Sequence, residues 1–162
     1  MTKTQPQDRD QSRKFRDWIL VGADFSKPAR QALVRARAMA RDREASLLIL
    51  HVIDGHGLDE LSGLIDMPEE ELRSRLGRHR RMLLEQLVEE VDDQGDAVPT
   101  ELVTSWGTPF EEILKKASDF AVDLIVLGTA GRSADLERAL FGSTAEKVLR
   151  AAPCPVLCVP TE

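Results

Sequence analysis

Cysteine is scarce in this sequence, which contains only Cys154 and Cys158 among its 162 residues. Residues four apart on one strand lie roughly 13 Å apart, whereas a disulfide needs Cα atoms closer than about 7 Å. The two cysteines therefore cannot bridge within an extended strand, and their spacing matches no zinc-binding motif. They are interpreted as small apolar residues of the core.

Long apolar runs and an excess of positive charge are also missing. No apolar run approaches the roughly 20 residues that cross a bilayer, and residues 1–16 lack the apolar centre of a secretory signal. The formal net charge of −6 argues against a nucleic-acid binder, which would normally be basic. The sequence therefore predicts a cytoplasmic protein with neither a membrane nor a nucleic-acid partner. Residues 1–16 are polar and are expected to form a flexible tail.

Patterns that indicate catalysis are absent as well. The sequence contains no P-loop with its Gly-Lys-Ser/Thr ending, no convincing Ser-His-Asp or Cys-His set, and no carboxylate pair with metal-site spacing. His51 lies between apolar residues of a predicted strand and is interpreted as a hydrogen-bonded core histidine rather than a catalyst. These observations favour a protein that is not an enzyme and has no metal site of its own.

The sequence does contain a regular alternation of predicted strands and helices, long enough for one domain with a substantial core. Continuous apolar runs are typical of strands that are buried on both faces of a parallel sheet. The alternation predicts an α/β three-layer sandwich for residues 17–162, with a five-stranded parallel sheet in the doubly wound order 3-2-1-4-5. The predicted strands are 18–23, 46–53, 100–105, 123–127 and 155–159, and the helices begin near Ser26, Asp66, Thr108 and Ala145.

Two local features complete this prediction. Residues 54–65 contain three glycines and are expected to form a long loop that can lie over a ligand. Asp66 and Glu69 are expected to form a capping box at the start of the next helix.

The segment that links the fourth strand to the last helix is the best candidate for a binding site. Gly128 and Gly131 follow the strand, and Gly142 precedes Ser143 and Thr144 at the helix start. Glycine permits turns with positive φ and leaves no side chain in the way of a ligand. A helix N-terminus presents free N–H groups and the positive end of its dipole to an anion. This pattern predicts a phosphate cradle.

The predicted strand order adds residues from other strands to this cradle. The helices that follow strands 1 and 4 diverge, which leaves a crevice at the carboxyl ends of these strands. Asp24, after the first strand, could accept hydrogen bonds from a ribose or an adenine amine, or could only brace its own loop. Val52, on the second strand, would form an apolar wall for a base. Arg132 and Arg138 lie in the glycine segment and would either pair with phosphate or face water.

These motifs resemble the nucleotide-binding signature of the universal stress protein family. The resemblance rests on Gly128-x2-Gly131 and Gly142-Ser143, and extends in the family's order to residues 19–26, 48–53 and 152–157. The spacer of residues 132–141 is one residue longer than is usual in the family. The resemblance implies an adenine nucleotide alpha hydrolase-like, Rossmann-like fold that binds ATP or another adenine nucleotide, with Mg²⁺ arriving on the phosphates. The contacts that it implies are Gly22, Ala23, Asp24, Val52, Leu127, Gly128, Gly131, Gly142, Ser143 and Thr144, and the loop residue Arg132 is a further candidate.

The same resemblance implies a stress-response protein that acts as a sensor or regulatory module. It also implies a homodimer through the C-terminal edge strand, where Val156 and Val159 belong to an apolar edge of the kind that pairs with another chain. Two alternatives remain open. The fold could serve as a nucleotide-free dimeric interaction protein, or it could hydrolyse ATP slowly.

Overall fold

The computed structural model describes residues 17–92, 97–129 and 142–160. Its centre is one five-stranded sheet in the order β3-β2-β1-β4-β5, with all neighbouring strands parallel. This finding confirms the predicted fold class and strand order. The strands are β1 (Trp18–Gly22), β2 (Ser46–Ile53), β3 (Thr100–Trp106), β4 (Leu124–Gly128) and β5 (Val156–Val159). The helices are α1 (Lys27–Arg43), α2 (Leu58–Leu64), α3 (Glu69–Val91), α4 (Pro109–Asp119) and α5 (Ser143–Ala151).

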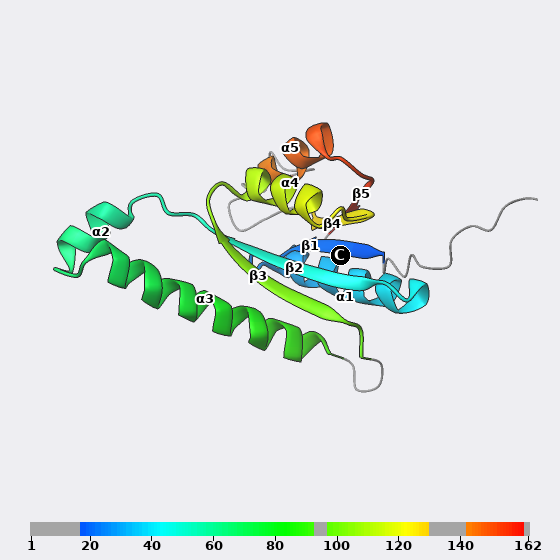
Figure 1. Cartoon of the computed structure of the whole chain (residues 1–162), viewed down its shortest axis with the longest axis horizontal. Helices are drawn as coiled ribbons and strands as arrows, with labels where there is room; N and C mark the ends of the chain where they lie inside the picture. Colours follow the sequence, from blue (N-terminus) through cyan, green and yellow to red (C-terminus); the bar gives the residue numbers. More distant parts are fainter. Residues whose placement is uncertain (1–16, 93–96, 130–141, 161–162) are drawn as a thin grey trace, which may run out of the picture.

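Helices cover both faces of the sheet, as Figure 1 shows. One apolar cluster joins the sheet to α1 and α3, and the other joins it to α4 and α5. Side chains alternate between the two clusters along each central strand, so Val21 faces α1 and α3 whereas Leu20 faces α4 and α5. The structure is therefore the three-layer sandwich that the sequence predicts.

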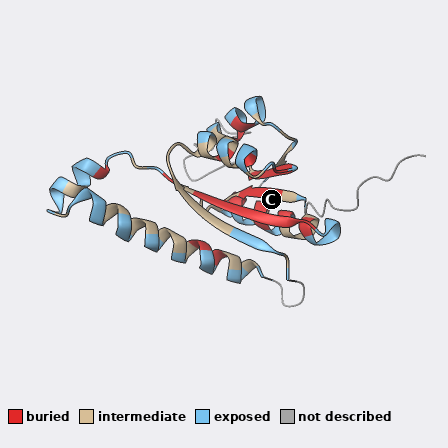
Figure 2. Ribbon diagram, viewed as in Figure 1, coloured by how far each residue is buried: buried red, intermediate tan, exposed pale blue. Residues whose placement is uncertain are grey.

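The central strands are buried on both faces, as Figure 2 shows. Leu20 of β1 lies opposite Leu48 of β2 on one side and opposite Ile125 of β4 on the other. All three side chains are fully buried. Each fully buried leucine or isoleucine contributes about 1.5–3 kcal/mol relative to an exposed one, so these apolar runs hold the sheet between its helix layers.

Helix α1 begins where its capping residues predict. Ser26 is the N-cap, and its Oγ accepts a hydrogen bond from the N–H of Ala29 at 3.2 Å. Pro28 occupies the first turn, where proline is tolerated because its missing N–H would have no helical acceptor. The helix ends at Arg43, and Glu44 follows in the left-handed conformation with φ of 54°.

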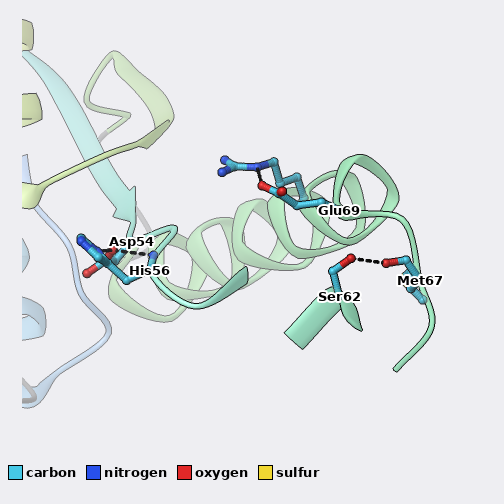
Figure 3. Close-up of polar contacts among 6 residues, drawn as sticks. Asp54, His56, Ser62, Met67 and Glu69 are labelled. Carbon is cyan, nitrogen blue, oxygen red and sulfur yellow. Dashed lines mark hydrogen bonds and ion pairs between the residues drawn. The ribbon is translucent and has the colours of Figure 1, made fainter. Parts of the chain in front are cut away.

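The region between β2 and α3 differs from the prediction. Residues 58–64 form the short helix α2 rather than a loop, and α3 has Pro68 as its N-cap with no side-chain capping bond, so the predicted capping box is wrong. Asp66 has a φ of 51° and lies in the turn between the two helices. The Ser62 hydroxyl closes this turn by donating to the carbonyl oxygen of Met67 at 2.5 Å (Figure 3).

Helix α2 and the first turns of α3 project beyond the sheet as an arm (Figure 1). Arg73 attaches this arm to the end of β3, because its guanidinium lies 4.9 Å from the centre of the Trp106 ring. The same guanidinium donates to Glu69 at 2.8 Å (Figure 3). The arm therefore has a polar anchor at the carboxyl edge of the sheet.

The two cysteines and the search for a helix that could cross a membrane can both be compared with the structure. Cys154 and Cys158 are both free thiols, as expected, and burial is the main cause that raises the pKa of each. Both lie at the margin of the core on the face covered by α4 and α5. Of the helices in the described ranges, none is long and apolar enough to cross a bilayer.

Candidate functional site

The candidate site lies where the winding direction of the sheet reverses, between β1 and β4. These strands are neighbours, with Val21 opposite Val126. The chain leaves β1 for α1 on one face of the sheet and leaves β4 toward α5 on the other. Ligands of doubly wound folds bind outside the carboxyl ends of the strands at such a switch point.

The start of α5 lies directly beside the end of β4. The N–H of Gly142 donates a hydrogen bond to the carbonyl oxygen of Thr129, and the N–H of Thr129 donates to Val159 on β5 at 3.0 Å. The structure thus brings together Gly128 and Gly142, from the two ends of the predicted cradle. Gly131, Arg132 and Arg138 lie outside the described residues.

The first turn of α5 supplies the groups that could hold an anion. The first helical bond runs from the N–H of Glu146 to the carbonyl oxygen of Gly142 at 3.1 Å. The N–H groups of Ser143, Thr144 and Ala145 precede it and meet no acceptor in the described part of the chain. Ser143 is exposed and Thr144 is half-buried. The structure differs from the prediction at Gly142, which was expected to contact the ligand. Its N–H already donates to the carbonyl oxygen of Thr129 and is therefore not free to bind an anion.

The charge near this turn is nearly balanced. Glu146 is the acidic residue of the first turn, and a carboxylate there would compete with a bound anion. Its carboxylate accepts from Arg150 at 2.8 Å on the same helix. This exposed pair screens the acidic charge, so the helix dipole remains the main electrostatic feature of the turn.

Asp24 braces its own loop with one carboxylate oxygen. Its Oδ1 accepts from the Ser26 N–H at 3.0 Å and from the Ser26 hydroxyl at 2.5 Å. Within residues 17–92, 97–129 and 142–160, the second oxygen, Oδ2, has no hydrogen-bond donor. The side chain is half-buried. The bracing role is therefore present, and Oδ2 is left to accept a hydrogen bond from a ligand.

Gly22 and Gly128 are both positions where a side chain would clash. A Cβ on Gly22 would lie 2.7 Å from Cδ2 of Leu127, and one on Gly128 would lie 2.6 Å from the carbonyl carbon of Pro28. The absent side chain of Gly128 thus makes room for the first turn of α1. The sequence prediction assigned that room to a ligand, so the structure gives this glycine a packing role that the prediction did not include.

The remaining predicted contacts differ in what they could offer a ligand. Leu127 is 5% exposed, so its side chain belongs to the core. Ala23 has both main-chain groups engaged, because its N–H donates to Leu50 at 2.8 Å and its carbonyl oxygen accepts from Nδ1 of His51 at 2.7 Å. That bond confirms His51 as a core histidine. Val52 is half-buried on the face covered by α4 and α5, where it can contact an apolar group.

The sequence interpretation missed a polar pair at the end of β2. The Asp54 carboxylate accepts hydrogen bonds from the backbone N–H of His56, at 2.9 Å, and from its Nδ1 (Figure 3). These bonds lower the pKa of Asp54, the backbone bond being the larger cause. Asp-x-His is a spacing at which the first side chain can close a turn onto the backbone two residues later, and that signal was available. Across the described ranges, no group of three or more His, Cys, Asp or Glu side chains could hold a metal ion.

Comparison with known proteins gives consistent matches along the chain. The profile of the Universal stress protein family matches residues 16–160. Universal stress protein MJ0577 of Methanocaldococcus jannaschii is 32% identical over 153 residues, which cover 87% of this chain and 93% of that protein. Universal stress protein YxiE of Bacillus subtilis is 34% identical over 146 residues, covering 87% of this chain and 97% of that protein. The solved structure of MJ0577 has a TM-score of 0.76 at 31% identity, covering 90% of this chain and 96% of its own.

Two more distant structures contain a nucleotide. A universal stress protein in complex with cAMP has a TM-score of 0.62 at 23% identity, covering 88% of this chain and 95% of its own. The universal stress protein from Archaeoglobus fulgidus in complex with dAMP has a TM-score of 0.59 at 19% identity, covering 90% of this chain and 98% of its own. At these identities the likeness shows a shared fold.

Proposed function

The chain belongs to the universal stress protein family, and from this premise we propose that it binds ATP or another adenine nucleotide at the carboxyl ends of β1 and β4. It would act as a sensor or regulatory module in a stress response. The observation that carries the proposal is the contact between Gly142 and Thr129. It holds the N-terminus of α5 at the switch point, where ligands of this fold class bind.

The phosphates would occupy the first turn of α5. The N–H groups of Ser143 and Thr144 have no acceptor among the described residues, and the two hydroxyl groups add donors at the same place. The helix dipole favours negative charge there. Mg²⁺ would arrive with the phosphates. Micromolar affinity corresponds to about 8 kcal/mol, which these donors and a partly buried base can supply.

The adenosine part would extend toward β1 and β2. Oδ2 of Asp24 would accept a hydrogen bond from the ribose or the adenine amine, and Val52 would contact the base. Gly22, Ala23, Leu127 and Gly128 would shape the site through the backbone, with Gly131 and Arg132 completing it from the adjoining segment. The complexes of more distant family members with cAMP and dAMP support an adenine nucleotide as the ligand class.

Titration calorimetry with ATP, ADP and AMP tests this proposal. Ser143→Asp places a carboxylate where the phosphate would lie and should abolish binding, yet Asp is favourable in a first helical turn, so the fold should remain intact. Ser118→Asp is the matched control, because it makes the same exchange at an exposed position near the end of α4. Unchanged affinity in Ser143→Asp, or no binding of any of the three nucleotides at millimolar concentration, would contradict the proposal.

We also propose that the bound nucleotide acts as a signal and is not rapidly turned over. The proposal rests on the sequence, which lacks a P-loop lysine to neutralise a γ-phosphate. Phosphate release from ATP should therefore stay close to the rate without protein. Rapid hydrolysis that Asp24→Ala abolishes would instead identify an ATPase.

The partner that we propose is a second copy of the chain, paired along β5. This strand is an edge of the sheet, and all four of its residues are partly exposed. On α5, which covers this side of the sheet, Leu149 is an exposed large apolar residue at 43% exposure. Val156 and Val159 lie at the two ends of the strand and would be covered by the partner. If the protein dimerises through β5 but binds no nucleotide, the nucleotide-free interaction protein becomes the better description.

A further inference from the structure

A cavity of about 180 Å³ that is open to solvent lies between α1 and α3, on the face of the sheet that α4 and α5 do not cover. Its apolar lining consists of Phe25, Leu83 and Leu87, and its polar lining includes Arg30, Arg80 and Glu90. An engineered cavity of about 150 Å³ accepts benzene. The cavity therefore has room for a single six-membered ring.

Arg80 is the polar residue of this cavity that forms no hydrogen bond or ion pair with another described residue. Its Nε is buried and has no hydrogen-bond acceptor in the described part of the chain. The guanidinium of Arg30 already forms an ion pair with Glu90. No carboxylate of the described residues forms an ion pair with Arg80, so this side chain adds an uncompensated positive charge to the lining.

Phe25 gives the cavity a fixed aromatic wall. Its φ of 64° is in the left-handed region, which is strained for a residue with a side chain and is most often found at functional sites. Its ring lies 4.4 Å from the ring of His51, centre to centre, and the Arg80 guanidinium carbon lies 6.0 Å from the centre of the Phe25 ring. A flat ligand could pack against this wall while it faces the guanidinium.

From these observations we propose that the cavity binds a small aromatic carboxylate. The ring would pack against Phe25, Leu83 and Leu87, and the carboxylate would pair with the guanidinium of Arg80, a residue that lines the cavity. This site is separate from the proposed nucleotide site, since it lies between α1 and α3, whereas the nucleotide would lie at the carboxyl ends of β1 and β4. The two are linked through one loop, because Phe25 directly follows Asp24.

Benzoate is the probe that tests the site, and the experiment uses nucleotide-free protein so that its result does not depend on nucleotide binding. The readout is the Nε–H signal of Arg80 in a nitrogen–proton correlation spectrum, assigned by its loss in Arg80→Gln. Benzoate at millimolar concentration should shift this signal in a saturable way. Benzyl alcohol, which lacks the carboxylate, should bind at least about tenfold more weakly, because hydrogen bonds to charged groups are worth more than neutral ones. Acetate should also bind at least about tenfold more weakly, because it lacks the apolar ring that the cavity would bury.

Two variants test the proposed contacts, with benzoate binding measured by titration calorimetry because Arg80→Gln removes the Arg80 signal. Arg80→Gln should weaken benzoate binding by about tenfold or more, whereas Arg78→Gln, an exposed arginine on the same helix that bonds to Ser74, should leave it unchanged. Leu83→Phe should block the ring by filling the cavity. The proposal is wrong if benzoate leaves the Nε–H signal of Arg80 unshifted, if acetate matches benzoate, or if Arg78→Gln and Arg80→Gln have equal effects. A shift that does not saturate would mean that benzoate does not occupy the cavity, which would also contradict the proposal.

Discussion

The N–H of Gly142 donates a hydrogen bond to the carbonyl oxygen of Thr129, so the residues that bracket segment 130–141 are in direct contact. This contact bears on the extra residue in the glycine spacer. Because α5 and β4 are joined at the base of the segment, an added residue need not move the helix N-terminus relative to the strand. Loops generally absorb single insertions, and the longer spacer is therefore compatible with a phosphate site at Ser143 and Thr144.

Gly128→Ala should destabilise the protein, because its Cβ would lie 2.6–2.8 Å from the backbone and Cβ of Pro28. Overpacking of this kind costs about 3 kcal/mol, and urea unfolding would measure it. Gly77→Ala is the matched control, since a Cβ there meets nothing within 4 Å and alanine in the middle of α3 should stabilise the helix by about 1 kcal/mol. Equal effects of the two substitutions would show that α1 does not pack closely against Gly128.

The two roles of Asp24 can be separated with its neighbour Ser26. Ser26→Ala removes the N-cap of α1 and one partner of Oδ1, and should reduce the free energy of unfolding by about 1 kcal/mol. It should leave nucleotide affinity nearly unchanged, because Oδ2 of Asp24 is untouched. Asp24→Ala should lower both quantities, as measured by urea unfolding and titration calorimetry. If Ser26→Ala weakens binding as much as Asp24→Ala does, Asp24 acts only by bracing the loop.

The hydrogen bonds from His56 lower the pKa of Asp54. The direction of this shift predicts how the stability of the fold should change with pH. A carboxylate whose pKa is lower in the folded state stabilises the fold above its unfolded pKa, and this contribution is lost as pH falls through the folded pKa. The effect should be small, since both side chains are exposed. His56→Ala should raise the pKa of Asp54 only part of the way in a carbon NMR titration, because the backbone N–H, the larger cause, remains. His79→Ala should leave it unchanged, and a full return to the ordinary value in His56→Ala would contradict the assigned order of causes.

The sequence predicted the sheet well because its central strands are recognisable locally. β2 is apolar except for Ser46 and His51, and its predicted range of 46–53 matches the structure. The helix α2 could not be recognised in this way. It has only seven residues, it contains Gly63, and its N-cap Gly57 makes no side-chain bond. Leu58 is its buried residue, so packing against α3, rather than helix propensity, accounts for its formation.

Part of the candidate site could likewise be predicted from the sequence, and part of it could not. Glycine spacing and strand order were sufficient to predict that Gly128 and the start of α5 meet at one edge of the sheet. The sequence could not reveal which backbone groups of the site were already engaged, because such contacts leave no pattern in the sequence. The bonded carbonyl oxygen of Ala23, the occupied N–H of Gly142 and the packing of Gly128 against Pro28 are of this kind.

Cys158→Pro should separate the proposed dimer without unfolding the subunit. The carbonyl oxygens of Pro155 and Val159 accept from β4, so alternation along the strand directs the N–H of Cys158 to the open edge. Proline is tolerated at an edge position whose N–H is not used within the sheet, and sedimentation should therefore show folded monomers. Leu157→Pro is the contrasting control, because by the same alternation it removes an N–H on the side of β4 and should lower stability by about 3 kcal/mol. Dimers that persist in folded Cys158→Pro would place the contact between subunits elsewhere.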